Sequence, residues 1–74
     1  MAHAKDLSNH LQAVYSAEGL EAKKEAMAEL IDFSAARTLK KESSRFTLSR
    51  LTSAAKIDTF ATNYMMSGEG MSVA

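Results

Sequence analysis

The sequence contains no cysteine, no proline and no tryptophan, and it has only three glycines among its 74 residues. Without cysteine the chain forms no disulfide, no thiolate metal site and no thiol nucleophile. A chain of this length makes one domain at most, and its core supplies a net stability of only about 3–5 kcal/mol. Because disulfides are excluded as a support, we expect the chain to associate with a second copy or with a larger protein.

Long apolar runs are also missing. No stretch reaches the roughly 18 apolar residues of a membrane span, and the first ten residues are too polar for a signal peptide. The absence of cysteine fits a cytoplasmic location, so we expect a cytoplasmic protein without a membrane partner. A compact, cysteine-free chain of this size is typical of small bacterial or viral accessory proteins.

Signals for β-strands are weak, because β-branched residues are scattered and no hairpin dipeptide such as Asn-Gly occurs. Alanine is frequent, and the sequence therefore predicts an all-α fold. We expect a single helical domain over residues 1–66. Residues 67–74, with two glycines among small polar residues, predict a flexible tail.

The first predicted helix covers residues 4–17. Leu7, Leu11 and Val14 recur at the spacing of one helical face, and Gly19 is a natural end because a left-handed residue often closes a helix.

The second predicted helix covers residues 20–41. Acidic residues lie near its start and basic residues near its end, which complements the helix dipole. We place a break at residues 42–44, because serine competes for backbone hydrogen bonds and suits a helix cap. No glycine or proline forces that break, so one continuous helix through residue 66, buried in an oligomer, remains an alternative. Its predicted core face consists of Leu20, Met27, Leu30 and Ile31.

The third predicted helix covers residues 44–66. An apolar stripe at helical period is expected to pack against the second helix. Leu48 lies nearly opposite this stripe, which indicates either a helix that is contacted on two sides or a local break near residues 52–53. The stripe consists of Phe46, Ile57, Phe60 and Tyr64.

The net charge of zero conceals an asymmetry, because residues 37–56 are strongly basic. Basic and hydroxyl side chains together can grip phosphates, so a small helix-turn-helix-like nucleic-acid-binding protein is the alternative function. Against it, the chain as a whole is neutral, whereas dedicated nucleic-acid domains are usually basic. The residues that would bind nucleic acid are Arg37, Lys40, Lys41, Arg45 and Arg50.

The preferred prediction is a non-enzymatic protein-interaction module that assembles with itself or docks on a larger protein. Arg50 falls within the aromatic stripe, where it can stack on Phe46 or pair with Glu25 or Glu29 of the second helix. Arginine, aromatic residues and methionine are also enriched at protein interfaces. The candidate interface residues are Leu48, Arg50, Phe60, Tyr64, Met65 and Met66.

Patterns that carry catalysis or metal binding are weak. No nucleophile elbow or phosphate-binding glycine loop is present, so we expect no catalytic residue, no cofactor and no enzyme activity. His3, Asp6 and His10 share one helical face, but three ligands near a chain end are a poor metal site, and we predict none.

Overall fold

The computed structural model describes the backbone of residues 3–66 and the side chains of residues 7–66. Within this range all regular structure is helical, as the sequence predicts, but there are four helices rather than three. The predicted tail over residues 67–74 lies outside the described residues, as do the side chains of His3 and Asp6. The helices are α1 (His3–Ser16), α2 (Leu20–Phe33), α3 (Thr38–Arg50) and α4 (Ala54–Met66).

The predicted break at residues 42–44 is wrong, because these residues lie inside α3. The chain leaves α2 earlier, at Ser34, whose backbone is extended with φ −70° and ψ 166°. The Ser34 hydroxyl donates to the Ile31 carbonyl at 2.7 Å and is hydrogen-bonded to the Tyr64 hydroxyl at 2.8 Å. This buried serine therefore ends α2, because its hydroxyl competes for a backbone carbonyl of the helix. The sequence predicts the same mechanism, but at residues 42–44 instead of at Ser34.

The second break follows Arg50, and it is the alternative that the position of Leu48 indicated. Leu51 is extended with φ −78° and ψ 134°, and α4 begins after Ser53. The Ser53 hydroxyl accepts a hydrogen bond from the Lys56 N–H at 3.2 Å, so Ser53 caps the new helix. The predicted helix over residues 44–66 is thus two helices.

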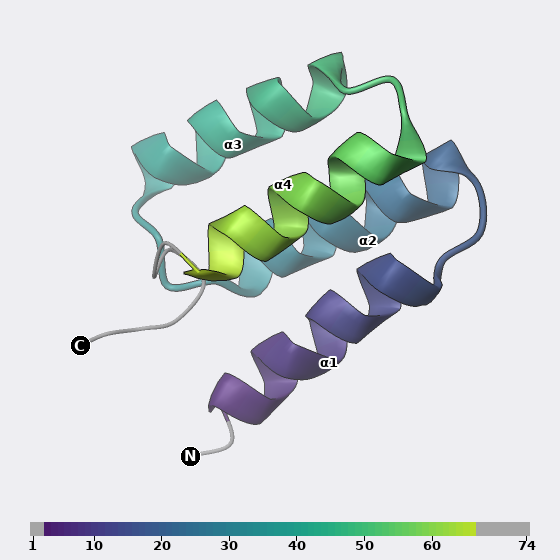
Figure 1. Ribbon diagram of the computed structural model, residues 1–74. Coiled ribbons are helices and arrows are strands. Elements are labelled where there is room, and N and C mark those ends of the chain that lie inside the picture. Colours follow the sequence, from purple (N-terminus) through teal and green to yellow (C-terminus); the bar gives the residue numbers. More distant parts are fainter. Residues whose placement is uncertain (1–2, 67–74) are drawn as a thin grey trace.

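The helices alternate in direction along the chain (Figure 1). α2 packs against each of the other three helices, and α1 also packs against α4. α3 packs chiefly against α2 and lies at the side of the bundle away from α1 (Figure 1).

The core lies mainly between α1, α2 and α4 and agrees with most of the predicted apolar stripes. Leu20, Leu11 and Phe60 are only partly buried at its margin. The assignment of Phe46 to the core is wrong, because 62% of this residue is exposed. The break after Arg50 turns α3 relative to α4, so the stripe predicted for one continuous helix is divided. The buried apolar residues are Leu7, Val14, Met27, Leu30, Ile31, Leu48, Ile57, Ala61 and Tyr64.

A buried lysine joins the three core helices. Lys23 is 7% exposed, and its ammonium group donates to the carbonyl oxygens of Val14 at 2.9 Å and Tyr15 at 3.1 Å, at the end of α1. The same nitrogen lies 3.0 Å from a carboxylate oxygen of Asp58 on α4. Three oxygens thus compensate the burial of the ammonium group, and its charge complements the C-terminal end of α1.

Candidate interaction surface

α3 presents two different faces. Its inner face contacts the bundle through only two buried residues, Ser44 and Leu48. On the opposite side Leu39 is 79% exposed and Phe46 is 62% exposed. These two side chains are seven residues apart, so they lie one above the other along the helix. We call Leu39, Ser43, Phe46 and Arg50 the outer face of α3.

Arg50 completes this outer face. Its guanidinium carbon lies 5.5 Å from the centroid of the Phe46 ring, so the predicted stacking of Arg50 on Phe46 is confirmed. The alternative pairing of Arg50 with Glu25 or Glu29 does not form, because the ion pairs among residues 7–66 are Lys23–Asp58 and Arg45–Asp32. The outer face therefore combines an aromatic ring, an aliphatic side chain and a cation held over the ring.

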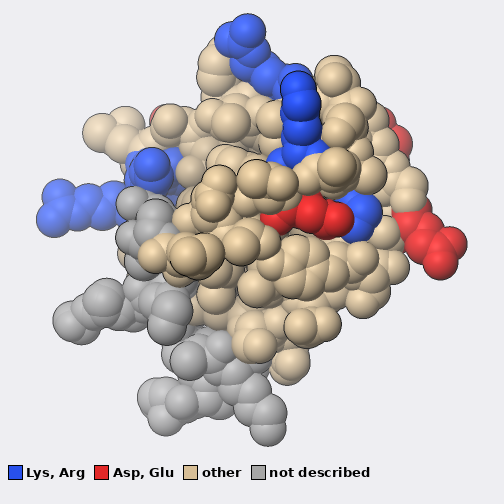
Figure 2. Space-filling model, in the orientation of Figure 1, with Lys and Arg blue, Asp and Glu red and all other residues tan. Residues whose placement is uncertain are grey.

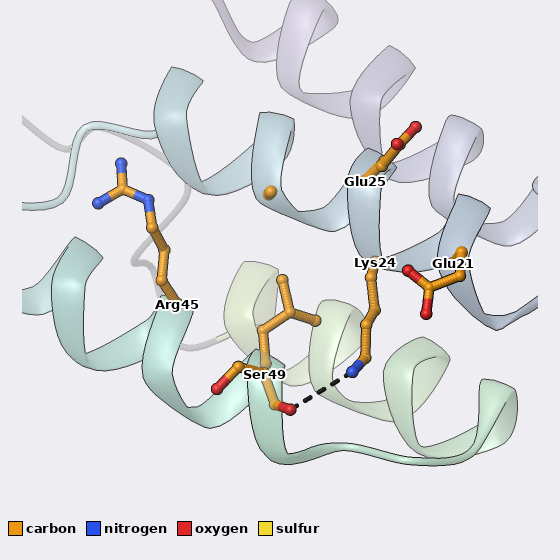
Figure 3. Close-up of a pocket in the computed structure, with 7 residues that line it drawn as sticks. Glu21, Lys24, Glu25, Arg45 and Ser49 are labelled. Atoms are coloured by element: carbon orange, nitrogen blue, oxygen red, sulfur yellow. Dashed lines mark hydrogen bonds between the residues drawn. The ribbon is translucent and has the colours of Figure 1, made fainter.

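The flanks of α3 are tied to α2 by polar contacts. Arg45 forms an ion pair with the Asp32 carboxylate, and the Lys41 ammonium donates to the Asp32 carbonyl at 3.0 Å. At the other end of α3, Lys24 reaches from α2 to the Ser49 carbonyl at 3.4 Å (Figure 3). These contacts are largely exposed, and each contributes little to stability.

A shallow open hollow of about 330 Å³ separates α2 and α3 beside these contacts. Leu48 is among the residues that line this hollow. Lys24 from α2 and Arg45 from α3 also line it (Figure 3). A second hollow, of about 240 Å³, lies between α3 and α4 and is lined by Ser43 and Asn63 among others. α3 is therefore held by a narrow inner face with open space on both sides.

The structure separates the six interface residues predicted from the sequence. Leu48 and Tyr64 are buried within the chain, and Phe60 and Met65 are half-buried. Arg50 and Met66, which is 79% exposed, lie at opposite ends of the molecule, where α3 and α4 end (Figure 1). These residues do not form one patch, and their binding to a partner stays a prediction.

Sequence reasoning missed Leu39 and misplaced Phe46. The available signal was their separation of seven residues within a segment whose other face carries Leu48. That pattern predicts a short helix with apolar residues on two sides, but it was obscured because Phe46 also fits the stripe of a longer helix.

Lysine and arginine side chains gather over α3 (Figure 2). Three of the five residues predicted to bind nucleic acid already have partners: Lys41 and Arg45 contact Asp32, and Arg50 stacks on Phe46. Among the described side chains, Arg37 and Lys40 form no ion pair. The basic residues thus serve partly to dock α3 on α2.

The candidate metal ligands are not assembled in the part of the chain that is described. His10 stacks against Phe33, with ring centroids 4.5 Å apart, and no group of three metal-binding side chains occurs among residues 7–66. No helix of the described range is long and apolar enough to cross a membrane.

Over residues 3–66 the chain is a small all-α domain of four helices. A search of protein families, curated proteins and solved structures returns no match to it.

Proposed function

We propose that the protein is a non-enzymatic, cytoplasmic interaction module that binds another protein chain through the outer face of α3. The observation that carries the proposal is the exposure of Leu39 and Phe46 on the side of α3 that its own bundle does not use. A monomer gains little in stability from side chains that are this exposed, whereas a partner that covers them removes apolar surface from water.

The chemistry of the outer face matches that of protein contacts. Aromatic residues and arginine are enriched among the residues that dominate binding energy at interfaces. The Arg50 guanidinium already lies over the Phe46 ring, so little side-chain freedom is lost when a partner covers both. The partner is either a second copy or a larger protein to which this chain is an accessory.

Two phenylalanines allow a matched test. Phe46→Asp places a charge on the outer face, and Phe33→Asp places the same charge on a ring that is 54% exposed at the end of α2. Mass by light scattering over a concentration series, together with co-purification from the source cells, reports binding for each variant. We expect Phe46→Asp to lose self-association or its co-purifying protein while Phe33→Asp keeps it. If Phe46→Asp and the unchanged protein behave alike in both assays, the proposal is wrong.

Nucleic acid is the competing partner, favoured by the exposure of Arg37 and Lys40 at the start of α3. A gel shift at low salt separates the two functions, because binding to phosphates weakens steeply as salt rises. Under the proposed function no such shift appears. A salt-sensitive shift that is abolished by Lys40→Glu with Arg45→Glu would favour nucleic-acid binding instead.

A further inference from the structure

The connection between α3 and α4 contains no residue type that forbids a helix. It contains no glycine or proline, and the φ of Leu51, −78°, is already close to the helical value of about −63°. The ψ of Leu51, 134°, is far from the helical value and ends α3. Rotation of this ψ to the helical value would let the helix continue beyond Leu51. In that case α3 and α4 become one helix over residues 38–66.

In such a continuous helix the outer face of α3 falls into line with the core face of α4. At 100° per residue, Ile57 lies about 20° from Phe46 and Tyr64 lies directly below Phe46. Leu39 joins the same line at about 20°. The spacing alternates between four and three residues, which is the heptad pattern of helices that pair along one seam. The complete series is Leu39, Ser43, Phe46, Arg50, Ser53, Ile57, Phe60 and Tyr64.

The continuous helix cannot pack on a single bundle. Leu48, which anchors α3 to α2, would lie about 160° around the helix from Phe46 and Tyr64. Leu48 would then face α2 of its own chain, whereas Ile57 and Tyr64 would face the opposite way. Ile57 and Tyr64 would therefore need the α1 and α2 surfaces of another molecule.

We propose that the partner of the outer face of α3 is a second copy of this chain, which is bound by exchange of α4. Each copy straightens at residues 51–53 and places its α4 on α1 and α2 of the other copy. This inference rests on the proposed function and names its partner.

The exchanged dimer keeps the contacts of the closed monomer. The pairs Lys23–Asp58 and Ser34–Tyr64 form between copies instead of within one, so the dimer re-forms the contacts that α4 gives up. Phe46 and Leu39, exposed in the monomer, come to lie on the side of the helix that faces the partner. The hydrogen bond from the Lys56 N–H to the Ser53 hydroxyl caps α4 in the closed monomer, so it favours the closed form over the exchanged dimer.

Proline at the first position of α4 separates the two forms. Ala54 is that position, where proline is tolerated in a separate helix. In a continuous helix the same proline removes a backbone hydrogen bond and clashes with the Arg50 carbonyl. We expect Ala54→Pro to raise the dimer dissociation constant by about 100-fold or more.

Thr38→Pro is the matched control, because Thr38 is the first residue of α3 and follows Arg37, whose ψ of 161° suits a residue before proline. This variant should dimerise like the unchanged protein. Ser53→Ala removes the cap from both copies and should lower the dissociation constant by roughly tenfold.

A distance within one chain identifies the straightened helix. Because the sequence has no cysteine, Lys40→Cys with Asn63→Cys gives two unique sites for spin labels outside the seam. These positions line one hollow of about 240 Å³ in the closed form, and they would lie about 35 Å apart in a continuous helix of 1.5 Å rise per residue. In a dimer prepared with an excess of unlabelled chain, we expect the long distance.

Two results would overturn the exchange. One is a dimer of Ala54→Pro as tight as that of Thr38→Pro, with the short label distance. The other is a chain that stays monomeric at every concentration even with Ser53→Ala. If association survives Ala54→Pro but is lost in Phe46→Asp, the proposed function stands and the exchange fails. If Phe46→Asp changes neither association nor co-purification, both the exchange and the proposed function fail.

Discussion

The two parts of the molecule differ in how their apolar residues are used. In α1, α2 and α4 the apolar stripes turn inward, and Lys23 and Ser34 add buried polar contacts between helices. α3 gives the core Leu48 alone among large side chains and leaves Leu39 and Phe46 in solvent. Tyr15, Phe33 and Met66 are exposed on the other three helices, one on each, whereas among the described residues only α3 exposes two large apolar side chains on one face. The comparison therefore separates a stabilising unit of three helices from one helix whose outer face its own bundle leaves uncovered.

The largest effect should come from the stabilising unit. Leu30 is fully buried on α2, and Leu30→Ala removes its contacts and leaves a cavity, which costs about 2–5 kcal/mol. Because the core of a domain of this size supplies only about 3–5 kcal/mol, we expect this variant to be mostly unfolded, as measured by circular dichroism and urea denaturation. A cooperative unfolding transition within about 1 kcal/mol of the unchanged protein would contradict the assignment of the core.

A smaller and more local effect should follow from Leu48→Ala. Leu48 is the main apolar anchor of α3, so its loss should release α3 while the other three helices stay folded. The free energy of opening measured by amide hydrogen exchange should fall by about 2 kcal/mol throughout residues 38–50, with a lesser change in α2. Equal acceleration in all four helices would show that α3 belongs to the same cooperative unit, and the comparison would fail.

The smallest of the three effects concerns the buried lysine. Lys23→Met removes the donor to Val14 and Tyr15 and leaves Asp58 unpaired, and we expect a loss of about 1–2 kcal/mol in the free energy of unfolding. Asp58 is 40% exposed and water compensates part of its lost partner, which keeps the effect moderate. Lys24→Met is the control, because its one hydrogen bond is exposed and 3.4 Å long. Urea denaturation that gives the two variants the same stability would refute the role of Lys23.

Much of the fold follows from the sequence. The all-helical class, the extent of α1 to within one residue at each end, and most of the core stripes come from helical period alone. The helix boundaries after residue 33 do not, because no glycine or proline marks them. They depend on tertiary contacts, such as the hydrogen bond between the Ser34 and Tyr64 hydroxyls, that a local pattern cannot contain.

The candidate surface could be predicted only in part. The contact between Arg50 and Phe46 is local, four residues apart on one helix, and sequence reasoning found it. The exposure of Phe46 depends on the break after Arg50, which turns α3 away from the line of α4. The buried Lys23 was also missed, although it lies between Leu20 and Met27 on the core stripe of α2, because a lysine at such a position is ordinarily read as solvent-exposed.

Concentration-dependent amide chemical shifts test the central claim, that the outer face of α3 binds a second copy of the chain. As the protein is concentrated, the account predicts that the signals of Leu39, Phe46 and Arg50 change first, together with those of residues 51–53. Signals on the outer side of α1 should stay constant. Shifts confined to α1, or spectra that are identical at all concentrations, would contradict binding of a second copy through α3.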